Sequence, residues 1–157
     1  MEAVRAFAAE GGPVVGICNG FQVLTEAGLL PGALQKNAGL KFLCRWVTIR
    51  IKSTASAITN RAELGQELTI PVNHFEGNYT VDPVTLTKLR AEERIVFRYV
   101  NNPNGSMDDI AGVCNEARNV VGLMPHPERA AHELLGSTDG KVMMQALVES
   151  ASQPVPA

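Results

Sequence analysis

The segment 13–22 constrains the fold of this chain more than any other. Its apolar run, 14–17, is typical of a short buried strand, and a helical pattern of apolar residues begins directly after it. A cysteine with small neighbours lies between the two, in the order Gly16, Ile, Cys18, Asn, Gly20. A strand that turns sharply into a helix at a nucleophile is a nucleophile elbow, so the segment predicts Cys18 at the tip of a tight turn.

The predicted elbow also gives the sulfur an electrostatic setting. Unpaired backbone N–H groups and the macrodipole at a helix N-terminus favour an anion, and therefore the nucleophilic thiolate form of Cys18. The N–H of Asn19 would point at the same space and could hold a developing oxyanion. The alternative is that Cys18 only packs at the end of a core strand, since free cysteine is among the most buried residue types.

A histidine between two prolines follows a second apolar strand pattern, 120–124, near the other end of the chain. The prolines favour extended backbone, in which residues two apart point the same way. Glu128 can therefore orient the ring of His126. Together with Cys18 these residues supply the thiol, the imidazole base and the orienting carboxylate of a catalytic triad. The alternative is a rigid surface turn with a solvated histidine.

Length and charge exclude several classes of protein. The 157 residues suit one domain, and the net charge of −2 gives no electrostatic case for nucleic acid or an anionic membrane as a partner. No apolar run approaches the roughly 18 residues of a membrane-spanning helix. The three cysteines are an odd number without framework spacing, which predicts reduced thiols and a cytoplasmic location. Cys44 and Cys114 are interpreted as packing residues, and no pair of Cys or His has zinc-ligand spacing, so we expect no metal.

Helical patterns at both ends of the chain flank a middle that is rich in strand patterns. We expect helices at 1–10, 20–28, 83–91, 128–135 and 141–149, and strands at 14–17, 42–51, 67–72, 94–100, 110–115 and 120–124. This order predicts a three-layer α/β domain with a mixed sheet over residues 1–150. The Pro-rich end, 151–157, is predicted to be a disordered tail.

The two catalytic segments resemble those of the class I glutamine amidotransferases. Three further segments, 37–42, 74–79 and 102–106, resemble one branch of that family, the glutaminase subunit of phosphoribosylformylglycinamidine synthase in purine biosynthesis. The resemblance runs from Met1 to about Glu149 and implies a flavodoxin-like amidotransferase domain.

The resemblance assigns roles to individual residues. It implies that Cys18 attacks the side-chain amide of glutamine, that His126 is the general base and acid, and that Glu128 orients His126. Gln22 matches a position near the glutamine pocket. His74 and Glu76 match a loop beside the pocket or the partner interface, but a His-x-Glu in a glycine-containing loop is more often a satisfied turn, so we leave both out of the catalytic set.

The implied reaction forms a glutamyl thioester, releases ammonia and then frees glutamate with water. Ammonia would pass to a synthetase partner that amidates formylglycinamide ribonucleotide, in a complex with a small accessory subunit. ATP and magnesium are expected on that partner and no cofactor in this chain, which contains no Gly-rich phosphate loop with its lysine.

The resemblance also implies that the domain is truncated at its N-terminus. Members of the family normally have a strand, a helix, a second strand and an oxyanion loop before the helix that opens this chain. We therefore expect the isolated chain to be weakly stable or to depend on a partner. Two alternative functions remain open: another γ-glutamyl hydrolase of the class I family, or a catalytically dead module that only binds the synthetase.

Overall fold

Two strands from opposite ends of the chain pair in parallel and organise the fold. In the computed structural model, which describes residues 1–152, β1 (Val14–Ile17) lies beside β8 (Val120–Leu123), with Val14 opposite Val120 and Ile17 opposite Leu123. Both strands therefore end at the same edge of the sheet. This is the edge at which the sequence predicts the thiol and the imidazole.

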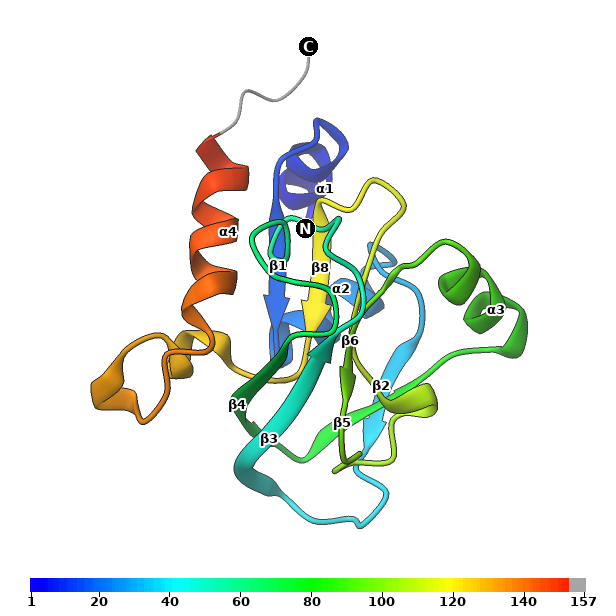
Figure 1. Cartoon of the computed structure of the whole chain (residues 1–157). Coiled ribbons are helices and arrows are strands. Elements are labelled where there is room, and N and C mark those ends of the chain that lie inside the picture. The colour runs from blue at the N-terminus through cyan, green and yellow to red at the C-terminus, as the bar shows by residue number, and fades with distance from the viewer. Residues whose placement is uncertain (153–157) are drawn as a thin grey trace.

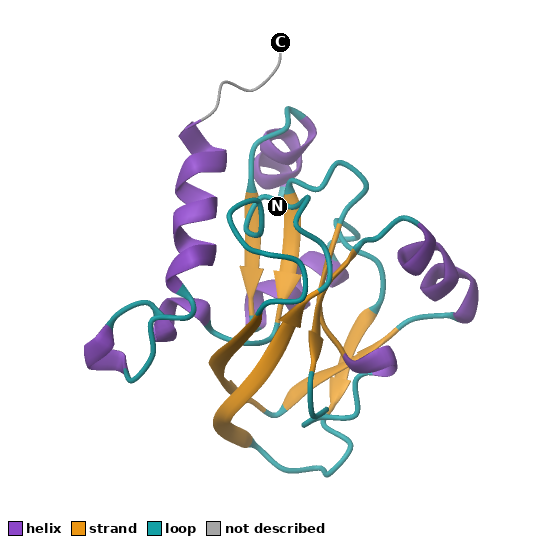
Figure 2. Cartoon of the chain, viewed as in Figure 1, coloured by secondary structure: helices purple, strands orange, loops and turns teal. Residues whose placement is uncertain are grey.

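The other strands complete a six-stranded mixed sheet (Figures 1 and 2). Its order is β1-β8-β7-β6-β3-β4, and every neighbouring pair except β1–β8 is antiparallel. The remaining strands of this sheet are β7 (Ile110–Cys114), β6 (Ile95–Tyr99), β3 (Leu43–Ile51) and β4 (Glu67–His74).

Helices cover both faces of this sheet, which gives the domain three layers. On one face, Met143 of α4 (Lys141–Ser152) joins a core cluster with Val121 and Leu123 of β8, and Leu147 of the same helix packs against that cluster. The other face packs against three helices, α1 (Glu2–Ala9), α2 (Asn19–Glu26) and α3 (Pro83–Ala91). Figure 1 shows α4 and α3 on opposite sides of the strands. The predicted three-layer α/β fold with a mixed sheet is confirmed.

A second, two-stranded sheet was not predicted. It pairs β2 (Ala33–Lys36) with β5 (Glu76–Thr80) in antiparallel orientation. These strands are short and largely polar, so they lack the apolar alternation that identifies a strand in sequence. Tyr79 attaches the small sheet to α2: its ring stacks on Phe21 with centroids 5.7 Å apart, and its hydroxyl donates to the Pro31 carbonyl at 2.8 Å.

The predicted helix at 128–135 is wrong. Two short 3₁₀ turns occupy this region, Pro127–Ala130 and Glu133–Leu135. A surface helix needs an apolar stripe to bury, and Leu134 is 91% exposed. His132 instead caps the second turn, because its ring accepts a hydrogen bond from the backbone N–H of Leu134 at 3.2 Å.

Two further expectations need correction. Cys44 is exposed on β3 rather than packed, whereas Cys114 is buried as predicted. The predicted disordered tail, 151–157, begins too early, because Ala151 and Ser152 form the last residues of α4. The rest of that tail lies outside the described residues. Within residues 1–152, no helix combines the length and apolarity needed to cross a membrane.

The elbow predicts unequal effects of alanine at its two glycines. A Cβ on Gly16 would lie 2.6 Å from the backbone carbonyl of Gly20, whereas a Cβ on Gly20 would meet nothing within 4 Å. We expect Gly16→Ala to lower the free energy of unfolding by about 1–3 kcal/mol, since backbone must move to accommodate it. Gly20→Ala should leave it unchanged or raise it by up to about 1 kcal/mol, because Gly20 lies within α2.

Urea unfolding of the two variants beside the wild type measures both effects. Equal destabilisation by the two substitutions would contradict this account of the elbow.

Candidate active site

Cys18 occupies a strained turn between β1 and α2. Its φ of 53° and ψ of −107° lie outside the regions that side-chain-bearing residues prefer, and such strain costs about 1–3 kcal/mol and concentrates at functional sites. Its backbone N–H donates to the Leu123 carbonyl at 2.8 Å, which continues the β1–β8 pairing up to the turn. The residue is 7% exposed, and its Sγ lies 3.7 Å from the carbonyl oxygen of Asn73.

The segment after β8 brings a histidine and a carboxylate together. His126 Nδ1 lies 2.6 Å from Glu128 Oε1, a hydrogen-bonding distance typical of a strong, charge-assisted pair. The backbone N–H of His126 donates to the Pro71 carbonyl on β4 at 2.8 Å, which fixes where this segment crosses the sheet edge. The carboxylate therefore holds the ring with Nε2 available on the opposite side.

Cys18 and His126 line one cavity of about 530 Å³. Its wall combines the end of β1, the start of α2, the β4–β5 turn and the segment after β8. The lining residues are Ile17, Cys18, Asn19, Gln22, Phe42, Asn73, His74, Phe75, Glu76, His126 and Arg129. Nε2 of His126 is buried, and it has no hydrogen-bond partner of good geometry among residues 1–152. It is therefore free to act on the sulfur and on a substrate in this cavity.

The electrostatics of the cavity keep the His126 ring charged. Interaction with the Cys18 sulfur and then the hydrogen bond with Glu128 raise the pKa of His126 to about 9, against the opposing effect of burial. Burial by itself would raise the pKa of Glu128. The hydrogen bond with His126 and the nearby positive charges outweigh burial and bring this pKa below its ordinary value. At neutral pH the pair is therefore an imidazolium and a carboxylate.

The other two predicted residues, Asn19 and Gln22, also reach the cavity. Asn19 is the first residue of α2, where backbone N–H groups have no partner within the helix, and its Oδ1 lies 3.9 Å from Sγ of Cys18. Gln22 donates from Nε2 to the Glu76 carbonyl at 3.1 Å. Gln22 thereby joins α2 to β5 at the wall of the cavity.

Sequence reasoning left several lining residues out of the site. His74 belongs to a segment that it identified but interpreted as a turn. Phe42 and Arg129 gave no separate signal, and Asn73 contributes its backbone carbonyl, which no side-chain pattern can indicate. No group of three or more His, Cys, Asp or Glu side chains in the described part of the chain could hold a metal ion.

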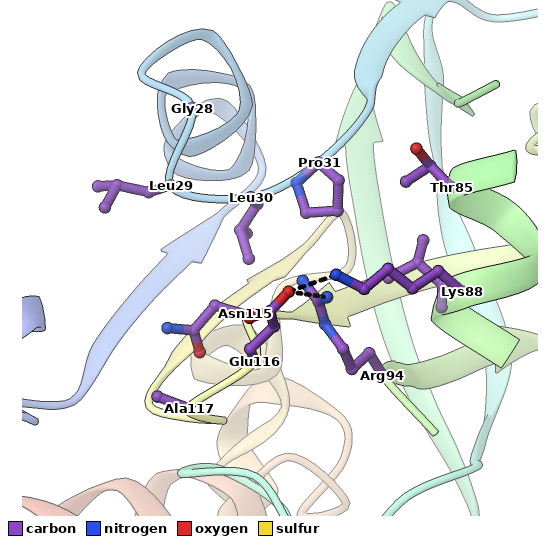
Figure 3. A pocket seen from close by; sticks show the side chains of 11 residues that line it. Gly28, Leu29, Leu30, Pro31, Thr85, Lys88, Arg94, Asn115, Glu116 and Ala117 are labelled. Carbon is purple, nitrogen blue, oxygen red and sulfur yellow. Dashed lines mark hydrogen bonds and ion pairs between the residues drawn. The ribbon is translucent and has the colours of Figure 1, made fainter. Parts of the chain in front are cut away.

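A larger cavity of about 630 Å³ lies at the opposite end of α2 and β8 (Figure 3). Its charged groups are paired with one another: Lys88 Nζ is 2.6 Å and an Arg94 guanidinium nitrogen 3.5 Å from Glu116 Oε1. Neither a cysteine nor a histidine among residues 1–152 lines this cavity. The thiol and the imidazole that could act as nucleophile and base therefore lie at the cavity of Cys18.

Comparison with known proteins agrees with this geometry. Residues 1–146 match the family described as the CobB/CobQ-like glutamine amidotransferase domain, and the chain belongs to that family. It is 57% identical over 148 residues to a protein of Lacticaseibacillus paracasei named phosphoribosylformylglycinamidine synthase subunit PurQ. That alignment covers 94% of this chain and 65% of the relative. A protein of the same name from Rubrobacter xylanophilus is 57% identical over 151 residues, 96% of this chain and 69% of that one.

Solved structures agree with the fold. The PurLQS structure from Thermotoga maritima aligns with a TM-score of 0.84 and 44% sequence identity, over 93% of this chain and 65% of that one. A glutamine amidotransferase from the same organism aligns with a TM-score of 0.54 at 15% identity, over 96% of this chain and 60% of that one, and so shares the fold alone. This chain thus spans about two thirds of the length of its similar relatives.

The two histidines of the cavity should affect stability in opposite directions with pH. Burial, and then the nearby His126, lower the pKa of His74 from 6.5 to about 4, while that of His126 rises from 6.5 to about 9. The contribution of His126 to the free energy of unfolding is therefore complete below pH 6.5 and is lost as pH rises through about 9. The contribution of His74 to the same free energy is complete above pH 6.5 and is lost as pH falls through about 4.

Urea unfolding of wild type, His126→Gln and His74→Gln between pH 4 and pH 9.5 measures both contributions. The wild-type minus variant difference should fall with rising pH for His126 and rise with it for His74. His132→Gln is the control, since that ring lies outside the cavity. Differences with the same slope for His74 and His126 would contradict the two charge states.

Proposed function

We propose that this chain is the glutaminase part of a phosphoribosylformylglycinamidine synthase and that it hydrolyses glutamine to glutamate and ammonia. The observation that carries the proposal is the 2.6 Å pair of His126 and Glu128 in one cavity with Cys18 at a strained elbow. The names of the relatives support the particular enzyme, and the family supports the amidotransferase reaction.

In the first half of the reaction, the thiolate of Cys18 attacks the carbonyl carbon of the glutamine side-chain amide. The oxyanion that forms is stabilised by the backbone N–H of Asn19 at the start of α2. His126, charged because Glu128 holds Nδ1, gives the proton on Nε2 to the amide nitrogen. The C–N bond breaks, ammonia leaves, and a glutamyl thioester remains on Cys18.

In the second half, water attacks the thioester while His126, now neutral, accepts its proton. The C–S bond breaks, glutamate is released, and the proton held by His126 restores the starting pair with the Cys18 thiolate. The balance is glutamine plus water giving glutamate plus ammonia. Gln22 at the cavity wall helps to define the glutamine pocket.

We further propose that ammonia passes to a synthetase subunit, which uses ATP and magnesium to amidate formylglycinamide ribonucleotide. The subunit names of the relatives support this partner, and a small accessory subunit completes the proposed complex. A cytoplasmic location stays a prediction.

Cys18→Ala tests the reaction directly. Removal of the nucleophile should reduce glutamate release from glutamine by at least about 10³-fold, because the thioester can no longer form. The matched control is Cys44→Ala, which removes an exposed cysteine outside the cavity and should leave the rate unchanged.

The assay is run on the full chain in the presence and absence of its synthetase partner, and with other γ-glutamyl amides. Turnover that survives Cys18→Ala would refute the proposed chemistry, and a preference for another γ-glutamyl amide would refute glutamine as its substrate.

Glu128→Gln tests the orienting carboxylate. We expect a loss of about 10²–10⁴-fold in kcat, because the ring loses both its orientation and the charge that stabilises imidazolium. The pKa of His126 should fall for the same reason, so the alkaline limb of the pH–rate profile moves to lower pH.

Glu133→Gln makes the same change on a neighbouring exposed carboxylate and should alter neither quantity. If the alkaline limb of Glu128→Gln coincided with that of wild type, Glu128 would not be the group that tunes His126.

A further inference from the structure

His74 is a buried polar side chain for which the proposed mechanism has no use. It is 4% exposed, it ends β4, and it lines the cavity of Cys18. Neither of its ring nitrogens has a hydrogen-bond partner within residues 1–152. Buried polar atoms are nearly always paired in folded proteins, so two unpaired nitrogens at the wall of a cavity indicate a ligand that pairs with them.

The protein holds this ring in place with the segments around it. Asn37 donates from Nδ2 to the His74 carbonyl at 3.0 Å. The ring lies against Gly77, where an added Cβ would come within 2.2 Å of a ring carbon. Asn104 and Ser106 both donate to the Gly77 carbonyl, at 2.7 Å and 3.1 Å. Side chains from two separate segments thus fix the backbone on both sides of one imidazole.

The ring is neutral at physiological pH. Burial, and to a smaller extent the charge on His126, lower the pKa of His74 to about 4. A neutral imidazole offers one N–H donor and one nitrogen acceptor. The acceptor suits a cationic donor group on a ligand, which a charged imidazole would repel.

The proposed reaction leaves one end of glutamine to be recognised. Its amide oxygen faces the Asn19 N–H, and its amide nitrogen takes a proton from His126. The polar groups that remain are the α-ammonium and the α-carboxylate, and Arg129, a cation at the cavity wall, matches the carboxylate.

We propose that His74 is a substrate-binding residue whose unprotonated ring nitrogen accepts a hydrogen bond from the α-ammonium group of glutamine. The proposal rests on the glutaminase function proposed above. It assigns His74 to recognition of the amino acid end of the substrate and leaves bond breaking to the triad.

The test compares glutamine with glutaramate, which has the same amide and carboxylate but no α-amino group. All proteins in this comparison carry Cys44→Ala, so that the exposed cysteine does not interfere with alkylation of Cys18, and the chain with this substitution alone is the parent. His74→Phe keeps an aromatic ring over Gly77 but removes both nitrogens, and His74→Gln retains a polar acceptor. For each variant, kcat and KM are measured with both substrates, and the rate of Cys18 alkylation by iodoacetamide is followed by mass spectrometry.

His74→Phe should raise KM for glutamine by about 10- to 100-fold, the range for one hydrogen bond to a charged group. It should leave KM for glutaramate and the alkylation rate within about twofold of the parent, and His74→Gln should restore part of the glutamine affinity. An equal rise in KM for both substrates, or a fall in kcat at constant KM, would overturn the assignment to the α-ammonium group.

Gly77→Ala provides a second route to the same answer, because it displaces the ring without changing its chemistry. It should raise KM for glutamine as His74→Phe does. The double variant Gly77→Ala with His74→Ala removes the clash, so its thermal stability should recover while its KM stays high. Recovery of KM in the double variant would mean that His74 only packs, and would overturn the proposal.

The parent chain separates this proposal from the proposed function. If the parent hydrolyses glutamine and the His74 variants match it, only the role of His74 fails. If the parent shows no glutamate release and no protection of Cys18 from iodoacetamide by glutamine, both fail.

Discussion

Parallel pairing of β1 with β8 is the constraint on which the rest of the site depends. Ile17 lies opposite Leu123, and the Cys18 N–H continues the ladder to the Leu123 carbonyl. Parallel strands end at the same edge of a sheet, so the residues that follow them emerge side by side. An antiparallel pair would have placed Cys18 and His126 at opposite edges. The distance of more than a hundred residues between them along the chain is therefore irrelevant to their chemistry.

A buried polar framework supports the opposite wall of the cavity. The β4–β5 turn comes close to the core, where backbone carbonyls need partners. Asn37 supplies one for His74, and Asn104 and Ser106 supply them for Gly77. These side-chain hydrogen bonds hold the backbone of an irregular segment, as backbone hydrogen bonds between neighbours hold a strand. The wall facing Cys18 is therefore held in position without a substrate. Such preorganisation is what positions a reacting group within the small tolerance that catalysis allows.

Much of this arrangement was predictable where a local pattern carries the information. The elbow, the strands of the main sheet and the long helices follow from apolar periodicity and from glycine and proline positions. The 128–135 segment resembled a helix because its residues favour one, but it buries no stripe and forms two 3₁₀ turns instead. The strands β2 and β5 gave no apolar signal, since Tyr79 alone buries a large side chain there. Cys44 looked like a core residue because its strand is apolar, although its own face of the strand is exposed.

The sequence by itself determined the fold class, the family and the residue types that the chemistry requires, because short-range periodicity and short motifs encode them. Only the tertiary structure decided which groups meet in the cavity and what charge they carry. The opposite pKa shifts of His74 and His126 arise from burial, from the sulfur and from Glu128. Burial and distance between residues that are remote in the chain exist only after folding, and a motif read along the chain contains neither of them.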